Sequence, residues 1–189
     1  MTRIHVIRHG RPASTWGDAD PDPGLDAVGA EQARAVAADL MALPEDLRPT
    51  RVVSSPLKRC RETAQPLADA LGVEVVIDER VGEIPTPAHL SAEDRPAWLK
   101  RAFQGLWSEI QGDLDYAAWT RGVASGVASH PGAAVFSHFV ALNAAVAVAT
   151  GDPRVAVFRP DHVSVTSFDL SDDGLILVKK GREASTQVL

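Results

Sequence analysis

The heptapeptide IHVIRHG occupies residues 4–10. Its first part, Ile4 to Ile7, is short and rich in β-branched residues, and a stretch rich in Gly, Pro and Asp follows from Gly10 to Gly24. This order predicts a first strand that runs into a long functional loop. Arg8 and His9 then stand at the carboxyl end of that strand, where ligands bind in open α/β sheets.

Strands and helices alternate along the rest of the chain. This alternation predicts an α/β fold, a layered domain with a mainly parallel sheet and an antiparallel edge. Apolar residues follow helical spacing after Asp26, the predicted N-cap, and the next helix begins near Leu57 and is kinked or restarted at Pro66. Further strands are predicted at 52–53, 73–77 and 133–136, helices at 96–111, 115–129 and 139–149, and a terminal hairpin at 163–168 and 175–179.

The composition predicts one globular domain over residues 1–189, with a helical cap around 85–130 that carries three of the four tryptophans. The net charge of −6 argues against binding to nucleic acid or to an anionic membrane. The apolar region 133–150 is interrupted by polar residues, so we expect no membrane span there, and the N-terminus is too charged for a signal peptide. A lone cysteine, Cys60, suits a cytoplasmic protein and excludes a zinc site built on several thiolates. The sequence sets no oligomeric state, and a homodimer is compatible with it.

Chemically active side chains follow three of the predicted strands. Arg8 and His9 follow the first, Arg59 comes shortly after the second, and His138 follows the fourth. Arginine presents a planar fork that matches two phosphate oxygens, and a neutral imidazole is the obvious nucleophile in such a set. His9 could attack phosphorus to give a phosphohistidine, while His138 and the arginines stabilise charge. No carboxylate cluster accompanies them, so we expect no metal and no cofactor.

These motifs together resemble the histidine phosphatase superfamily, in its phosphoglycerate mutase-like branch. The matching stretches are RHG at residues 8–10, LDAVGAEQA at 25–33, SSPLKRCRETA at 54–64 and SH at 137–138. The resemblance implies a three-layer α/β/α sandwich that works without metal and a phosphate pocket made of His9, Arg8, Arg59 and His138. It also implies that an acidic residue after the third strand donates a proton to the leaving group.

Two glutamates compete for the role of proton donor. Glu83 is the best match to the family donor, and Glu79 is the alternative. A carboxyl group serves as an acid if burial raises its pKa enough to keep the proton.

Three positions depart from the family pattern. Phe139 follows His138 where many members carry glycine, and Arg11 stands where Glu-Thr or a similar pair begins in many members, so that Arg11 could recognise a second anionic group. His162 stands at a position that is often asparagine, and we assign it no role. Trp16 lies in the loop after His9, where it could touch a substrate.

The sequence therefore predicts a metal-independent phosphatase that hydrolyses small-molecule phosphate monoesters through a phosphohistidine on His9. A phosphomutase that uses the same intermediate is the second hypothesis. A non-catalytic module that binds a phosphorylated ligand is the third.

Overall fold

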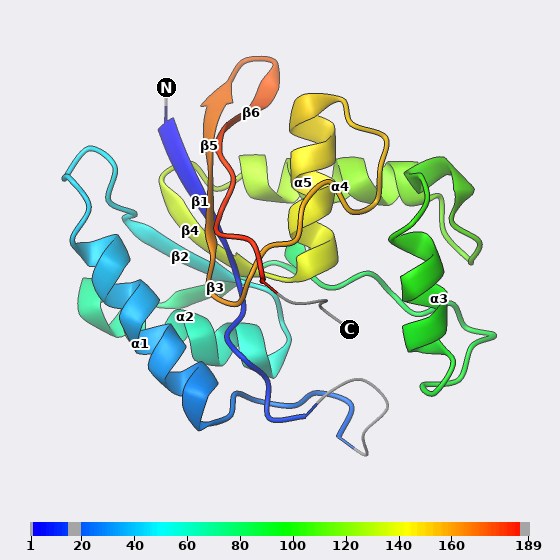
Figure 1. Ribbon diagram of the computed structural model, residues 1–189. Helices are drawn as coiled ribbons and strands as arrows, with labels where there is room; N and C mark the ends of the chain where they lie inside the picture. Colours follow the sequence, from blue (N-terminus) through cyan, green and yellow to red (C-terminus); the bar gives the residue numbers. More distant parts are fainter. Residues whose placement is uncertain (1, 15–19, 186–189) are drawn as a thin grey trace.

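The computed structural model describes residues 2–14 and 20–185, which are built around a six-stranded sheet with the order β3-β2-β4-β1-β5-β6 (Figure 1). The first four strands in this order are parallel, whereas β5 and β6 form an antiparallel hairpin at one edge. The predicted mixed sheet is confirmed. The strands are β1 (Thr2–Arg8), β2 (Arg51–Ser54), β3 (Val75–Ile77), β4 (Ala133–Ser137), β5 (Val165–Ser171) and β6 (Gly174–Lys179).

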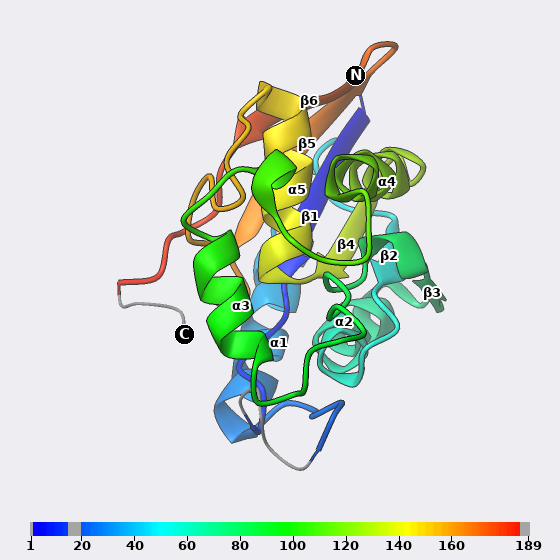
Figure 2. The ribbon, with the colours of Figure 1, turned by 90° about the vertical axis from the view of Figure 1, so that its right-hand side faces the viewer.

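Helices cover both faces of the sheet. One layer contains α1 and α2, which contact each other, and the other contains α4 and α5, which lie side by side in front of the sheet in Figure 2. No helix in the described ranges is long and apolar enough to cross a membrane. The helices are α1 (Ala27–Met41), α2 (Lys58–Leu71), α3 (Arg95–Ala102), α4 (Tyr116–Ala128) and α5 (Phe139–Thr150), with short 3-10 turns η1 (Glu79–Val81) and η2 (Trp107–Glu109).

Side chains that alternate along β1 fill two separate cores. Val6 packs in a cluster with Leu142 of α5, whereas Ile7 packs on the opposite face with Leu40 of α1 and Leu67 of α2. Because neighbouring strand residues point to opposite faces, a fully buried strand needs a helix layer on each side. The fold is thus the α/β/α sandwich that the sequence predicted.

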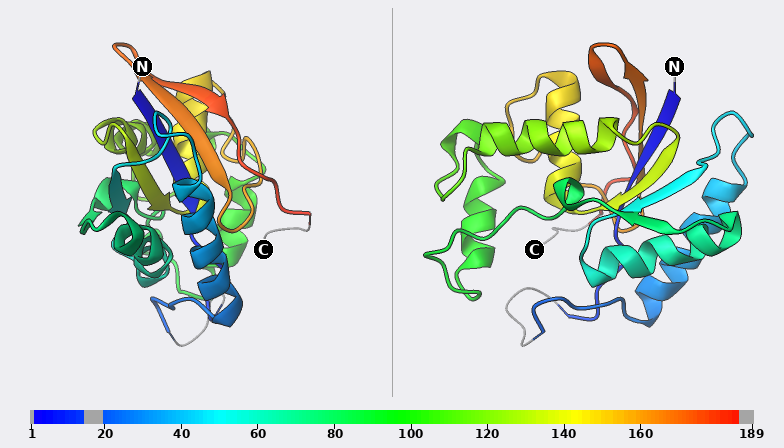
Figure 3. Two further views of the ribbon diagram at one scale, coloured as in Figure 1. Left: turned by 90° about the vertical axis from the view of Figure 1, so that its left-hand side faces the viewer. Right: turned by 180° about the vertical axis from the view of Figure 1, so that it is seen from behind.

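Residues 85–130 divide between two places. Helix α4 packs on α5 as part of the main helix layer, whereas α3 stands to one side of the sheet, across from α1 and α2 (Figures 1 and 3). A third apolar cluster fills the space under α3 and contains Trp98, Trp107, Tyr116 and Phe139.

Two helix predictions need correction. The helix predicted at 96–111 ends at Ala102, and a turn and η2 follow it. Helix α2 runs without interruption through Pro66, although proline removes one backbone donor. The buried Leu67 and Ala68 anchor this part of α2 in the core, which offsets the lost hydrogen bond.

Two strands begin two residues later than predicted. Gly72 ends α2 in the left-handed conformation with φ of 67°, and the Val73 N–H bonds back to the carbonyl of Ala68, so Val73 belongs to the helix cap. Val163 has a positive φ of 51°, which is incompatible with a strand, and β5 starts at Val165.

Candidate active site

The ends of β1, β2 and β4 bring the predicted site residues together. The ring centroids of His9 and His138 lie 5.3 Å apart. The Nδ1 atom of His138 lies 3.2 Å from Nη2 of Arg59 and 3.8 Å from Oε2 of Glu83. Arg8 directly precedes His9, and all five residues have buried side chains. The strand order places β4 between β1 and β2, which is why segments distant in sequence meet here.

Hydrogen bonding sets the tautomer of His9. Its Nδ1 lies 2.8 Å from the carbonyl oxygen of Gly10, and since a carbonyl can only accept, Nδ1 carries the proton. The lone pair is therefore on Nε2. Burial lowers the pKa of His9 well below its usual value, and the neighbouring His138 and Arg8 lower it further. A neutral imidazole with an available lone pair can act as a nucleophile.

His138 is held at both ring nitrogens. Arg59 donates to Nδ1, so the proton of the neutral ring is on Nε2, which donates to Oγ of Ser55 at 2.7 Å. Burial lowers the pKa of His138, and the positive charges of Arg59 and Arg8 add to this effect. The ring is fully buried and neutral, with a fixed orientation.

Glu83 reaches the same site from the loop after η1. Its side chain is 7% exposed, and burial raises its pKa, while the positive charges of Arg95 and Arg59 oppose the rise. The loop is fixed because the Ser137 hydroxyl donates to the carbonyl of Val81 at 2.7 Å. A carboxyl group with a raised pKa can donate a proton near neutral pH.

The alternative donor, Glu79, has a different environment. It is an exposed residue in η1, and it lines a surface pocket with Arg80 and Trp119. The geometry therefore sets Glu83 rather than Glu79 beside His138.

Close packing explains two glycines and a threonine of the matching motifs. A Cβ atom on Gly10 would lie 2.8 Å from the carbonyl oxygen of Gly29, and one on Gly29 would lie 2.1 Å from that of Arg11. Thr63 accepts from the backbone N–H of Gly10 at 3.0 Å and donates to the carbonyl of Arg59 at 2.6 Å. These contacts lock the loop after β1 onto α1 and α2.

Three residues of the site had no predicted role. Ser55, which holds His138, lies within one of the matching motifs but carries no signal of its own for this contact. Arg95 projects from α3 and donates to the carbonyl of Ile84 at 2.9 Å, next to Glu83, and no sequence pattern indicates this.

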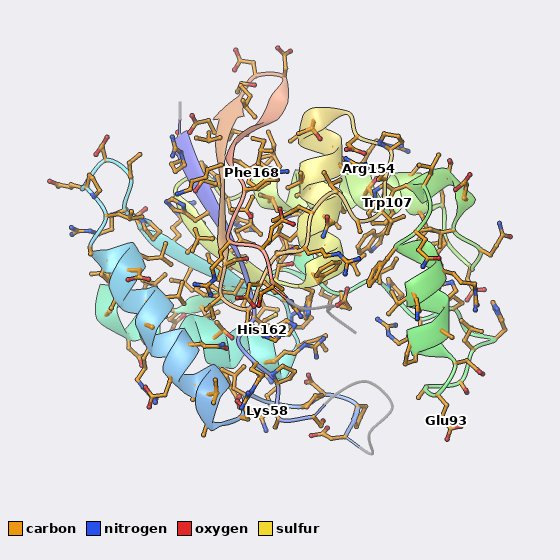
Figure 4. All side chains as sticks on the ribbon, in the orientation of Figure 1. Lys58, Glu93, Trp107, Arg154, His162 and Phe168 are labelled. Carbon is orange, nitrogen blue, oxygen red and sulfur yellow. The ribbon has the colours of Figure 1, made fainter. Side chains whose placement is uncertain are left out.

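The third residue is His162, whose ring centroid lies 5.9 Å from that of His9. Burial and the charge of Arg8 lower its pKa to about 4, so the ring is neutral at pH 7. Figure 4 places His162 at the same end of the molecule as Lys58, the first residue of α2, and far from Phe168 in the middle of β5.

The remaining expectations concern residues around this cluster. Arg11 pairs with Asp26, the N-cap of α1, with Nε 2.6 Å from Oδ2. Cys60 is a buried thiol whose pKa is raised by burial, as expected of a small core residue. Trp16 lies outside the described residues.

The described residues form an α/β protein in which two histidines and two arginines lie together at the carboxyl ends of the parallel strands. The chain belongs to the histidine phosphatase superfamily, branch 1, because the family model matches residues 4–182. The expected family is thereby confirmed.

Individual relatives are more distant. The chain is 32% identical over 117 residues to a protein named probable phosphoglycerate mutase from Erwinia tasmaniensis, a match that covers 56% of this chain and 51% of the relative. It is 34% identical over 122 residues to the 55 kDa subunit of transcription factor tau from Saccharomyces cerevisiae, covering 58% of this chain and 27% of the subunit. The chain thus spans about half or less of the length of these relatives.

Solved structures share the fold over nearly the whole chain. Phosphoserine phosphatase from Entamoeba histolytica, in complex with 3-phosphoglyceric acid, superposes with a TM-score of 0.74 at 20% identity, covering 96% of this chain and 98% of that one. Mycobacterial glucosyl-3-phosphoglycerate phosphatase in complex with VO3 gives a TM-score of 0.72 at 23% identity, covering 98% and 100%. At these identities the likeness shows a phosphoglycerate mutase-like fold.

Proposed function

We propose that this protein is a phosphatase that hydrolyses small-molecule phosphate monoesters through a phosphohistidine on His9. The observation that carries the proposal is the neutral His9 ring, whose Nδ1 proton is engaged by Gly10 and whose Nε2 lone pair is available. This ring lies among Arg8, Arg59 and His138. The arginines have no lone pair to offer, and both ring nitrogens of His138 are engaged in hydrogen bonds.

The reaction has two displacements. Nε2 of His9 attacks phosphorus, a P–N bond forms, and the ester P–O bond breaks as Glu83 gives its proton to the departing oxygen. Water then attacks the phosphohistidine, Glu83 takes a proton from that water, and the P–N bond breaks to release inorganic phosphate. Glu83 suits both steps because burial raises its pKa without removing it from water entirely.

The cationic groups act on the phosphoryl oxygens. Arg8 and Arg59 can each offer several N–H donors, which suits a phosphate dianion and the charge of the transition state. Burial lowers the pKa of Arg8 to about 10, still well above neutrality. The neutral His138 acts through Arg59, because its Nδ1 accepts from Nη2 of Arg59 at 3.2 Å while Ser55 fixes the ring from the other side.

We infer that the reaction needs no metal ion. The groups around His9 are arginines and neutral histidines, with Glu83 as the carboxylate nearest to His138. Magnesium and calcium prefer clusters of oxygen ligands, and a cationic surrounding disfavours them.

A phosphomutase is the second candidate, favoured by the relatives that are named probable phosphoglycerate mutase. It would transfer the phosphoryl group from His9 to another hydroxyl of the bound molecule instead of to water. A module that binds a phosphorylated ligand without turnover is the third candidate, and it is favoured by the similarity to a transcription factor subunit.

Product analysis separates the three functions. The purified protein is incubated with a panel of alkyl phosphates that includes 3-phosphoglycerate, and inorganic phosphate, isomerised ester and acid-labile phosphoprotein are measured together. We expect inorganic phosphate and a phosphoprotein that is absent from His9→Ala. Isomerised ester without phosphate would indicate a mutase, and the absence of both turnover and phosphoprotein would indicate a binding module.

A further inference from the structure

Phe139 occupies an unusual place in this site. It is the first residue of α5, directly after His138, and its ring is 7% exposed. The guanidinium carbon Cζ of Arg8 lies over this ring, 5.5 Å from its centroid. The departure from the family pattern at Phe139 is therefore in direct contact with a proposed phosphate ligand.

Arg8 makes few hydrogen bonds to the described residues. It is 7% exposed, and its Nη1 donates to the carbonyl of Pro160 at 2.9 Å. Its Nε has no hydrogen-bond partner among the described residues. A buried guanidinium needs compensation for its lost hydration. Glu83 and Asp161 stabilise the charge of Arg8 electrostatically, but no carboxylate in the described ranges forms an ion pair with it at 4.0 Å or less.

An aromatic face offers a compensation that a carboxylate does not. The negative face of the ring attracts the cation, but it leaves the in-plane N–H donors for other acceptors. A carboxylate would occupy those donors and repel an incoming phosphate. Phe139 can thus restrain the plane of Arg8 and keep its donors directed at an anion.

The ring itself is held from its other side. Phe103, the C-cap of α3, packs against Phe139 with ring centroids 5.1 Å apart and an angle of 43° between the planes. Both rings belong to the cluster under α3, which includes Trp98 and Trp107. The position of Arg8 therefore depends on packing from the segment that follows the Glu83 loop.

We propose that Phe139 is the positioning residue for Arg8, whose guanidinium plane it orients for binding a phosphoryl group. This inference rests on the proposed phosphate role of Arg8. The contact depends on the residue that this chain carries here, because the glycine of the family pattern at this position has no ring.

Binding of orthovanadate and inorganic phosphate to Phe139→Leu tests the proposal. Leucine keeps an apolar side chain in the cluster and removes the aromatic face, so we expect vanadate and phosphate to bind about 10- to 30-fold more weakly, the scale of a desolvated cation–π contact. Phe139→Tyr keeps the ring and should bind within about threefold of the wild type. Phe168→Leu, the same change in a fully buried ring of β5, is the matched control and should leave binding unchanged.

A second background separates this role from general packing. Lysine at position 8 keeps the charge but has no plane to orient, so Phe139→Leu in an Arg8→Lys background should cost less than about threefold. If Phe139→Leu loses as much in that background as in the wild type, the ring acts on something other than Arg8 and the inference is wrong. Unchanged vanadate affinity in Phe139→Leu would also overturn it.

Two further results complete the test. If Phe139→Leu folds poorly, Phe139→Met is measured in its place, since an unbranched apolar chain adapts to such a cluster. If the wild-type protein binds neither vanadate nor phosphate, the proposed function itself fails, whereas wild-type binding with an unaffected Phe139→Leu refutes only the role of Phe139.

Discussion

Replacing Glu83 by glutamine isolates the proton that the first step requires. Glutamine has nearly the same size and keeps a carbonyl oxygen that can accept the backbone N–H of Ile84, which now bonds Oε1 at 2.9 Å. It cannot supply a proton. Because the Glu83 side chain is 7% exposed and lies 3.8 Å from His138, bulk water cannot easily substitute as the donor. We expect turnover of an alkyl phosphate to fall about 100-fold or more, which corresponds to about 2.7 kcal/mol in the barrier.

The assay compares two leaving groups in the same variant. An alkoxide is strongly basic and needs the proton, whereas nitrophenolate leaves without one, so nitrophenyl phosphate should be hydrolysed much faster than the alkyl ester by Glu83→Gln. Glu79→Gln is the matched control, since Glu79 is exposed and outside the cluster, and it should leave both rates unchanged.

The pH dependence gives an independent measurement. Burial raises the pKa of Glu83, so the acid form persists above the usual range of a glutamate, and activity on alkyl phosphates should fall as pH rises through that pKa. This alkaline limb should vanish in Glu83→Gln. A raised pKa in the folded state contributes stability at low pH that is lost as pH rises. The melting temperature of Glu83→Gln relative to wild type should therefore be higher at pH 8 than at pH 4.

Equal losses for both leaving groups would refute the acid role and indicate that Glu83 binds phosphate or holds the loop. If neither rate changes in Glu83→Gln, the donor lies elsewhere in the site.

Four other variants or treatments probe the rest of the mechanism. His9→Ala should abolish both turnover and trapped phosphoprotein, whereas His5→Asn, in the preceding strand β1, should retain them; full activity in His9→Ala would refute the covalent route. A chelator should leave the rate unchanged and vanadate should inhibit, and restoration by Mg²⁺ after chelation would contradict this. Arg59→Ala should weaken both substrate and vanadate binding about 10- to 100-fold, measured as KM and Ki. Ser55→Ala removes the acceptor for Nε2 of His138 and should lower kcat about tenfold, while Ser54→Ala, an equally buried neighbour that bonds only backbone, should not.

Much of the site could be predicted because its residues follow strands directly. A strand end is readable from a short β-branched run and the loop residues after it, and parallel strands present these ends along one edge. The sequence therefore predicts that His9, Arg59 and His138 share one edge of the sheet. The same local reading predicted Asp26 as an N-cap, and its side chain does accept the N–H of Gly29 at 2.7 Å.

Boundaries were less predictable than elements. The end of α3 at Ala102, the continuity of α2 through Pro66 and the positive φ of Val163 depend on packing against distant segments. Local propensity does not contain those contacts, and burial can outweigh it.

Motif identity and strand position are local properties, so the sequence shows which residue types could handle phosphate. The chemical states of these residues depend on the fold. The tautomer of His138 depends on Ser55 and Arg59, which lie 83 and 79 residues away in the chain, and the raised pKa of Glu83 depends on its burial. The contact of Phe139 with Arg8 likewise joins α5 to β1. Desolvation and hydrogen bonding arise from the surroundings of a side chain in space, and sequence spacing does not encode those surroundings.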